Sequence, residues 1–129
     1  MIELKGDVGS GKTTLTQGIA AGLGFSGEVS SPTFTLSRAY PLKDGSSLHH
    51  FDFYRLKGHD IATEELYEVT QDPTAIVVIE WPGQGAAKLP ARRLRITIAP
   101  LEQENHRSIL LESLAGGGEA VIGKISHDT

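Results

Sequence analysis

The chain is constrained most by one short stretch near its start, residues 6–14, which reads GDVGSGKTT. Gly6 is followed by four residues and then by Gly11, Lys12 and Thr13, which is the G-x-x-x-x-G-K-[ST] spacing of a phosphate-binding loop. Glycines in such a loop let the backbone turn tightly and bring its N–H groups against phosphate oxygens. A chain with this much glycine matches the pattern by chance about one time in a hundred. The match therefore predicts a nucleotide-binding site.

The residue types in this loop suit the binding of a nucleoside triphosphate with its metal ion. Lys12 is expected to reach the β- and γ-phosphates, and the Thr13 hydroxyl is expected to ligate Mg²⁺. A helix that starts at the end of the loop adds N–H groups and the positive end of its dipole. The predicted nucleotide-binding residues of the loop are Gly6, Gly9, Ser10, Gly11, Lys12, Thr13 and Thr14.

The residues on either side of the loop provide the setting that such a loop requires. Residues 2–5 form a short strand-like run before it. Residues 15–23 follow it as a predicted helix, because Leu15, Ile19 and Leu23 recur every four residues on one face. A strand, a glycine loop and a helix in this order favour an α/β domain.

Composition limits the class of protein further. The chain has 129 residues, of which 39% are hydrophobic and 22% charged, so we expect one domain over residues 1–125 with a disordered tail over residues 126–129. The absence of cysteine excludes disulfides, cysteine zinc sites and thiol nucleophiles. A net charge of −4 argues against a broad nucleic-acid-binding face. No apolar run approaches the length of a membrane span, and we expect a cytoplasmic protein.

The rest of the chain predicts a mixed sheet with a parallel centre. Asp44-Gly45 is a turn signal between two strand-like runs, which predicts a β-hairpin over residues 34–54. Residues 75–79 are apolar throughout, as in a parallel strand buried on both faces. The other predicted elements are a helix at 60–69, strands at 94–98 and 108–111 (the latter extending as far as 114), and a last short element at 120–122.

Glu80 directly follows the buried strand at 75–79 and resembles a Walker B carboxylate. Ligands of open α/β sheets lie beyond the carboxyl ends of the strands, where such an acid can orient Mg²⁺ or the attacking water. The alternative is a solvated carboxylate at a strand end. Trp81 follows at once and is expected to lie beside the same site.

Known classes of phosphate-loop protein leave several possibilities. Guanine recognition is not expected, because the only asparagine, Asn105, is followed by His106 and no Thr-Lys-x-Asp element occurs. None of the arginines forms an evident lid helix of the kind that metabolite kinases use. These absences favour an ATPase whose catalytic set is incomplete and is completed by a partner. A small-molecule kinase and a non-hydrolysing nucleotide-sensing module remain as alternatives.

Four blocks together resemble a named family. They are GDVGSGKTT at 6–14, SPTF at 31–34, HFDFYRL at 50–56 and VVIEWP at 77–82. In this order they resemble the TsaE (formerly YjeE) family, the ATPase component of bacterial tRNA threonylcarbamoyladenosine biosynthesis. The resemblance implies a P-loop NTPase-like three-layer α/β domain with a mixed sheet, which has a parallel centre, an antiparallel hairpin and antiparallel edge strands.

The resemblance also implies roles for individual residues. Thr33, Asp52 and Glu80 would be the catalytic residues, and Trp81 would lie close to the nucleotide. The metal ligands would be Thr13, Thr33 and Glu80, with ATP and Mg²⁺ as the cofactors. Which of Asp52 and Glu80 orients water and which supports Mg²⁺ stays open.

Partners follow from the same resemblance. Family members hydrolyse ATP weakly alone and act with the TsaB and TsaD subunits, which modify adenosine 37 of tRNA, so contact with tRNA would be indirect. Members usually carry about one helix and one strand before the loop strand, and we expect that segment to be missing here.

Two further groups of side chains have no role in the predicted site. The basic cluster of Lys88, Arg92, Arg93 and Arg95 is expected to be a solvated edge, with docking to a partner or to tRNA phosphate as the alternative. His49 and His50 alternate along a strand, so one should face inward, and neither is expected to bind metal.

Overall fold

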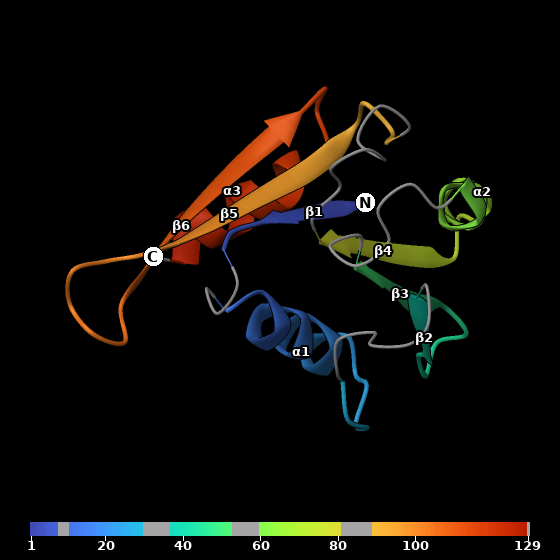
Figure 1. Ribbon diagram of the computed structural model, residues 1–129, viewed down its shortest axis with the longest axis horizontal. Helices are drawn as coiled ribbons and strands as arrows, with labels where there is room; N and C mark the ends of the chain where they lie inside the picture. The colour runs from blue at the N-terminus through green and yellow to red at the C-terminus, as the bar shows by residue number, and fades with distance from the viewer. Residues whose placement is uncertain (8–10, 30–36, 53–59, 81–88, 129) are drawn as a thin grey trace.

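The computed structural model describes residues 1–7, 11–29, 37–52, 60–80 and 89–128. Over these ranges the chain forms one mixed α/β unit, shown in Figure 1. Its elements are β1 (Ile2–Lys5), α1 (Lys12–Gly22), β2 (Ser37–Pro41), β3 (Ser47–Asp52), α2 (Asp60–Thr70), β4 (Ala75–Glu80), β5 (Arg93–Pro100), β6 (Arg107–Leu114) and α3 (Glu119–Asp128).

The strands form one six-stranded sheet in the order β2-β3-β4-β1-β5-β6. The four inner strands are parallel to one another, while β2 pairs antiparallel with β3 and β6 pairs antiparallel with β5. The predicted mixed sheet with a parallel centre and antiparallel edges is confirmed. Strand β4 is central, and its residues Val77, Val78 and Ile79 are almost completely buried, as its apolar run predicted.

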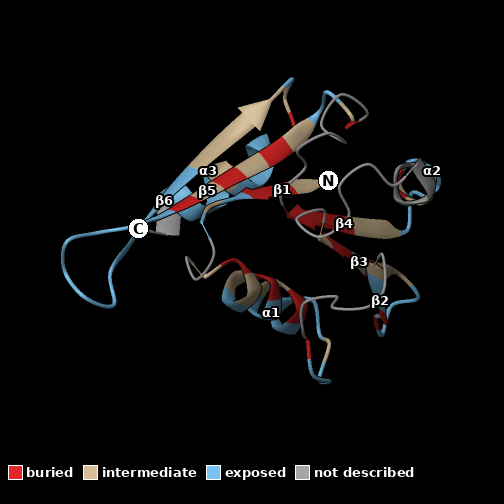
Figure 2. Cartoon of the chain, viewed as in Figure 1, coloured by how far each residue is buried: buried red, intermediate tan, exposed pale blue. Residues whose placement is uncertain are grey.

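Helices cover both faces of the sheet. Alternate strand residues, such as Leu48 and Val78, pack in one apolar cluster with α1 and with Ile122 of α3. The intervening residues, such as Phe51 and Val77, pack in a second cluster with α2. The domain therefore has three layers, and Figure 2 shows the buried residues concentrated in the inner strands and on α1.

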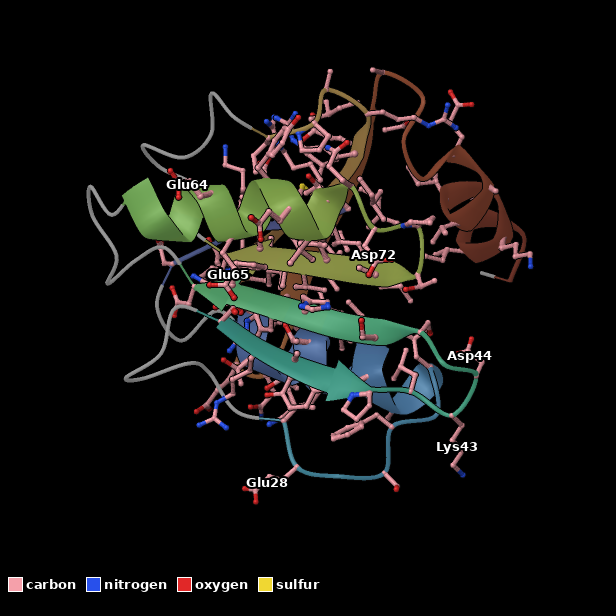
Figure 3. All side chains as sticks on the ribbon, turned by 90° about the vertical axis from the view of Figure 1, so that its right-hand side faces the viewer. Glu28, Lys43, Asp44, Glu64, Glu65 and Asp72 are labelled. Carbon is pink, nitrogen blue, oxygen red and sulfur yellow. The ribbon has the colours of Figure 1, made fainter. Side chains whose placement is uncertain are left out.

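The β2–β3 hairpin is confirmed for residues 37–52, while residues 34–36 and 53–54 of the predicted hairpin lie outside the described residues. Asp44 forms its turn, because Asp44 Oδ1 accepts the backbone N–H of Ser46 at 3.0 Å. Gly45 follows with φ 87°, which a glycine adopts without strain. Figure 3 shows Lys43 and Asp44 at the outer tip of this hairpin.

Helix α2 is hydrogen-bonded to the same hairpin. Ser37 at the start of β2 donates a hydrogen bond of 2.8 Å to Glu65 Oε1, and Figure 3 shows Glu65 on α2. The predicted helix at 60–69 is confirmed, with one more residue at its end.

Helix α1 begins earlier than predicted, at Lys12 instead of Leu15. It ends at Gly22, and the chain then turns at Gly24, which has φ 91°: the Gly24 N–H bonds to Ala21 O and the Phe25 N–H bonds to Ala20 O, each at 3.0 Å. This is the paired hydrogen-bond pattern of a glycine-terminated helix.

The prediction of a disordered tail from Ser126 was wrong for residues 126–128, and so was that of only a short element at 120–122. Both belong to helix α3, which runs to Asp128. Gly116 and Gly118 have φ of 83° and 74° and turn the chain after β6, and the Ile122 N–H then bonds to Gly118 O at 3.0 Å. Packing of Ile122 against the apolar cluster gives this glycine-containing helix a support that the local sequence does not reveal. None of the helices in the described ranges is long and apolar enough to cross a membrane.

Candidate nucleotide-binding site

Three parallel strands bring the ends of three sequence blocks to one edge of the sheet. Strands β1, β3 and β4 run in the same direction and end at Lys5, Asp52 and Glu80. Glu80 lies opposite Asp52 on one side and opposite Leu4 of β1 on the other. The glycine loop leaves β1 at this same edge, where ligands of open α/β sheets bind.

Asp52 and Glu80 also share a face of the sheet. Side chains of a strand alternate between faces, and Leu48 and Val78 of these strands pack in the cluster that contains α1. Asp52 follows Leu48 by four residues and Glu80 follows Val78 by two, so both acids are on the face that α1 covers. The structure thus brings together two acids that lie 28 residues apart in the sequence.

Helix α1 begins directly after Gly11, the last glycine of the loop. Gly11 has φ 110°, a left-handed conformation that favours glycine, and it precedes the helix without a side-chain cap. The backbone at a helix start is a binding site for anions, because the first N–H groups and the helix dipole both favour negative charge. The local geometry is therefore suited to a phosphate group.

Lys12 is the buried cation of the site, with 7% of its surface exposed. Its Nζ donates to the backbone oxygen of Gly6 and lies 3.4 Å from that of Asp7. Burial lowers the pKa of the Lys12 amine, and the negative charges of Glu80, Asp52 and Asp7 oppose that shift. Lys12 begins α1, the helix that covers the face of the sheet on which both acids lie.

Histidine 50 is a site residue that the sequence reasoning did not assign. Its side chain is completely buried, and its Nε2 lies 3.3 Å from Oε1 of Glu80. His49 faces the opposite side of the sheet, where its Nε2 bonds to Ser47 Oγ at 2.8 Å. Alternation predicted that one of the two faces inward. The signal that was missed is that His50 precedes Asp52 by two residues on the same strand and therefore shares its face.

The acids fit a magnesium ion in the manner of other phosphate-loop sites. Within the described ranges, no three His, Cys, Asp or Glu side chains gather closely enough to hold a metal ion by themselves. Mg²⁺ does not need such a cluster, because it keeps several waters and takes one or two carboxylates together with phosphate oxygens. Glu80 is 3% exposed and ends a parallel strand opposite Asp52, so carboxylates of the kind that Mg²⁺ takes lie at this edge of the sheet.

The remaining predicted site residues divide into two groups. Thr13 and Thr14 lie in the first turn of α1, where Thr13 is half-buried and Thr14 is exposed. Outside the described residues lie Gly9, Ser10, Thr33 and Trp81.

The prediction of a solvated edge for the basic cluster was wrong for Arg93 and Arg95. Arg93 Nε donates to Glu3 Oε1 at 2.9 Å, and Arg95 Nε donates to Glu3 Oε2 at 3.0 Å. Glu3 is 2% exposed and lies on the face of the sheet away from α1. The pairing arises because alternate residues of β5 share a face with Glu3 on the adjacent β1. Arg92 is exposed, and Lys88 lies outside the described residues.

Comparison with known proteins adds a family match. The family model described as "Threonylcarbamoyl adenosine biosynthesis protein TsaE" matches residues 1–109. A protein of Streptomyces coelicolor named tRNA threonylcarbamoyladenosine biosynthesis protein TsaE is 41% identical over 99 residues, which are 76% of this chain and 67% of that protein. A protein of the same name from Bacillus subtilis is 38% identical over 132 residues, covering 99% of this chain and 79% of its own length.

A solved structure has the same fold. The crystal structure of YdiB from Bacillus subtilis superposes with a TM-score of 0.73 at 32% sequence identity. The match covers 99% of this chain and 78% of that chain.

Proposed function

The chain belongs to the TsaE family, and from this premise we propose that it takes part in threonylcarbamoyladenosine modification of tRNA as an ATP-hydrolysing subunit. The relatives' names support the tRNA pathway. The hydrolysis of ATP is our inference from the site.

One observation carries the ATPase proposal. The buried Lys12 begins the helix that covers the face of the sheet where two carboxylates end adjacent parallel strands. A lysine, a helix start and an acid at this edge of a sheet are the parts with which phosphate-loop NTPases hold and activate a triphosphate.

The chain's own residues have distinct tasks in this proposal. Lys12 and the backbone N–H groups at the start of α1 bind the β- and γ-phosphates and offset the charge that develops as the bond breaks. One of Asp52 and Glu80 orients a water molecule. The water oxygen forms a bond to the γ-phosphorus as the bond from that phosphorus to the bridging oxygen breaks. ADP leaves with the bridging oxygen and its bonding electrons, and both protons of the water leave with the inorganic phosphate.

The other carboxylate, together with the hydroxyls of Thr13 and Thr33, would hold Mg²⁺. When bound, the ion would supply positive charge that offsets the negative charge of the triphosphate. Gly6, Gly9, Ser10, Gly11 and Thr14 would bind the nucleotide through the loop backbone.

We propose that the isolated chain turns over slowly and that TsaB and TsaD accelerate it. Arg93 and Arg95 are held by Glu3 on the face of the sheet away from α1, so neither serves the phosphate site. In other phosphate-loop enzymes, an arginine supplied at the γ-phosphate adds about 10³–10⁵ in rate. A partner that completes the site would couple hydrolysis to assembly of the modifying complex.

Two variants test the site directly. Lys12→Ala should abolish ATP binding in a calorimetric titration, and unchanged affinity would refute the phosphate-loop assignment. Glu80→Ala should lower turnover much more than ATP affinity; equal losses in both would point to a metal-holding or structural role for this carboxylate. Glu28→Ala is the matched control, because Glu28 is an exposed acid on the loop after α1 (Figure 3) and should change neither quantity.

Assays of ADP and phosphate release separate the alternatives. A kinase would release ADP only when an acceptor is present, whereas the proposed ATPase releases phosphate into water. A nucleotide-sensing module would bind ATP without releasing phosphate, even with partners present.

A further inference from the structure

His50 is a buried polar side chain to which the proposed chemistry gives no task. Its side chain has no exposed surface. Neither ring nitrogen has a hydrogen-bond partner among the described residues, and the same is true of Glu80 Oε1. Buried polar side-chain atoms nearly always have a partner, so each exception calls for an explanation. Here two such atoms, His50 Nε2 and Glu80 Oε1, face each other at 3.3 Å.

The sheet register explains why these two side chains meet. His50 on β3 lies directly opposite Val78 on β4, and Glu80 is two residues further along β4 on the same face. Along the direction of the strands, His50 therefore lies two residues before the position of the carboxylate. It is further from the edge where the nucleotide is proposed to bind. Its neighbours Leu48 and Val78 belong to the apolar cluster under α1. The side chains of these two apolar neighbours cannot hydrogen-bond to the imidazole.

We propose that His50 is a positioning residue that donates its Nε2–H to Glu80 Oε1 and so holds the carboxylate in one orientation. This proposal rests on the proposed ATPase function of Glu80. An ionised carboxylate only accepts hydrogen bonds, so the imidazole must carry its proton on Nε2. The remaining carboxylate oxygen then serves water or Mg²⁺ from a fixed position.

The distance between His50 Nε2 and Glu80 Oε1 fits a positioning role for the imidazole. At 3.3 Å it is slightly longer than an ordinary N–H···O hydrogen bond. Hydrogen bonds of catalytic groups are commonly long or poorly aligned before substrate binds, and they shorten in the loaded site. The donor that orients a metal-binding or catalytic group typically contributes 10–100-fold in activity or metal affinity.

His49 provides a control within the same strand. It faces the other side of the sheet and bonds to Ser47, so its removal deletes a histidine next to position 50 without touching the site. We therefore compare His50→Leu, which removes the donor at similar volume, with His50→Gln, whose amide nitrogen can replace Nε2, and with His49→Leu.

The first measurement is ATP turnover by the full chain with its partner proteins. His50→Leu should lower kcat about 10–100-fold with little change in KM for ATP, while His50→Gln keeps a larger share of the activity and His49→Leu keeps all of it. Unchanged kcat in His50→Leu would overturn the proposal. So would a loss that His50→Gln does not rescue at all while its melting temperature equals that of the wild type.

The second measurement asks whether His50 acts through Glu80. Mutations of residues that act as a unit are not additive. In a Glu80→Ala background, His50→Leu should therefore cause no further loss of kcat. A full additional loss would show that His50 acts independently of Glu80 and would overturn the proposal.

The third measurement does not depend on hydrolysis. Nitrogen-15 spectra of the imidazole side chains, assigned with His50→Leu, should show His50 protonated on Nε2, with a proton signal that moves in Glu80→Ala. An Nδ1-protonated ring, or a signal that is indifferent to Glu80→Ala, would overturn the positioning role. If the wild type binds ATP but never releases phosphate, the proposed function fails, and these spectra still decide whether His50 holds Glu80.

Discussion

The buried ion cluster around Glu3 gives a prediction whose size follows from the structure. Glu3 is 2% exposed and accepts hydrogen bonds from Arg93 Nε at 2.9 Å and from Arg95 Nε at 3.0 and 3.3 Å. Hydrogen bonds to charged groups contribute about 1.5–3 kcal/mol each, and breaking a fully buried ion pair costs about 3–5 kcal/mol. Glu3→Gln keeps the volume and one acceptor oxygen but removes the charge.

The expected loss of unfolding free energy is smaller than for the breaking of a fully buried ion pair. The two arginines are 15% and 26% exposed, so water solvates part of the charge that loses its partner. We therefore expect Glu3→Gln to lower the free energy of unfolding by about 2–3 kcal/mol at neutral pH. For a domain of this size, such a loss lowers the melting temperature by about 8–12 °C.

The pH dependence of this effect follows from the pKa of Glu3. Burial alone would raise this pKa, but the hydrogen bonds and charges of Arg95 and Arg93 outweigh burial, so it lies below its ordinary value of 4.5. The stabilisation is then complete above that ordinary value and is lost as the pH falls through the lower pKa of the folded protein. The difference between wild type and Glu3→Gln should therefore be largest at neutral pH and shrink below pH 4.5.

Urea unfolding followed by circular dichroism measures this difference at each pH. Glu28→Gln is the control, because this exposed acid should change stability by no more than about 0.5 kcal/mol. The reasoning would be refuted if Glu3→Gln cost no more than the control at neutral pH. It would also be refuted if the stability difference between wild type and Glu3→Gln did not shrink below pH 4.5.

Two further predictions concern the core and a close backbone contact. Phe51→Ala removes a completely buried side chain from the cluster under α2 and should cost about 3–5 kcal/mol in the same urea experiments; a cost below 1 kcal/mol would contradict the packing. Gly117→Ala would place its Cβ in a clash with the backbone of Arg93, whereas nothing lies within 4 Å of a Cβ added at Gly123. Thermal melting should therefore show a clear loss for Gly117→Ala and none for Gly123→Ala, and equal effects would refute the contact.

The sequence predicted the sheet well because its central signals are local. The apolar run at 75–79, the turn at Asp44-Gly45 and the strand before the loop each determine an element from neighbouring residues. The meeting of Asp52 and Glu80 was also foreseeable, because the carboxyl ends of parallel strands lie at one edge.

The features that the sequence missed depend on residues far apart in the chain. Glu3 meets arginines about 90 residues away only because β1 and β5 are neighbours. His50 meets Glu80 only through the β3–β4 register. The glycines within and before α3 argue against a helix locally, and the packing of Ile122 outweighs them.

The central claim is that ATP is hydrolysed at Lys12, Asp52 and Glu80 and that partner proteins accelerate the reaction. The most direct test is the rate of phosphate release by the wild type and by Glu80→Ala, each with and without TsaB and TsaD. Slow release by the wild type alone, a strong rise with the partners and no such rise in Glu80→Ala would support it. Rapid release by the isolated chain, or equal rates for wild type and Glu80→Ala in the presence of the partners, would contradict it.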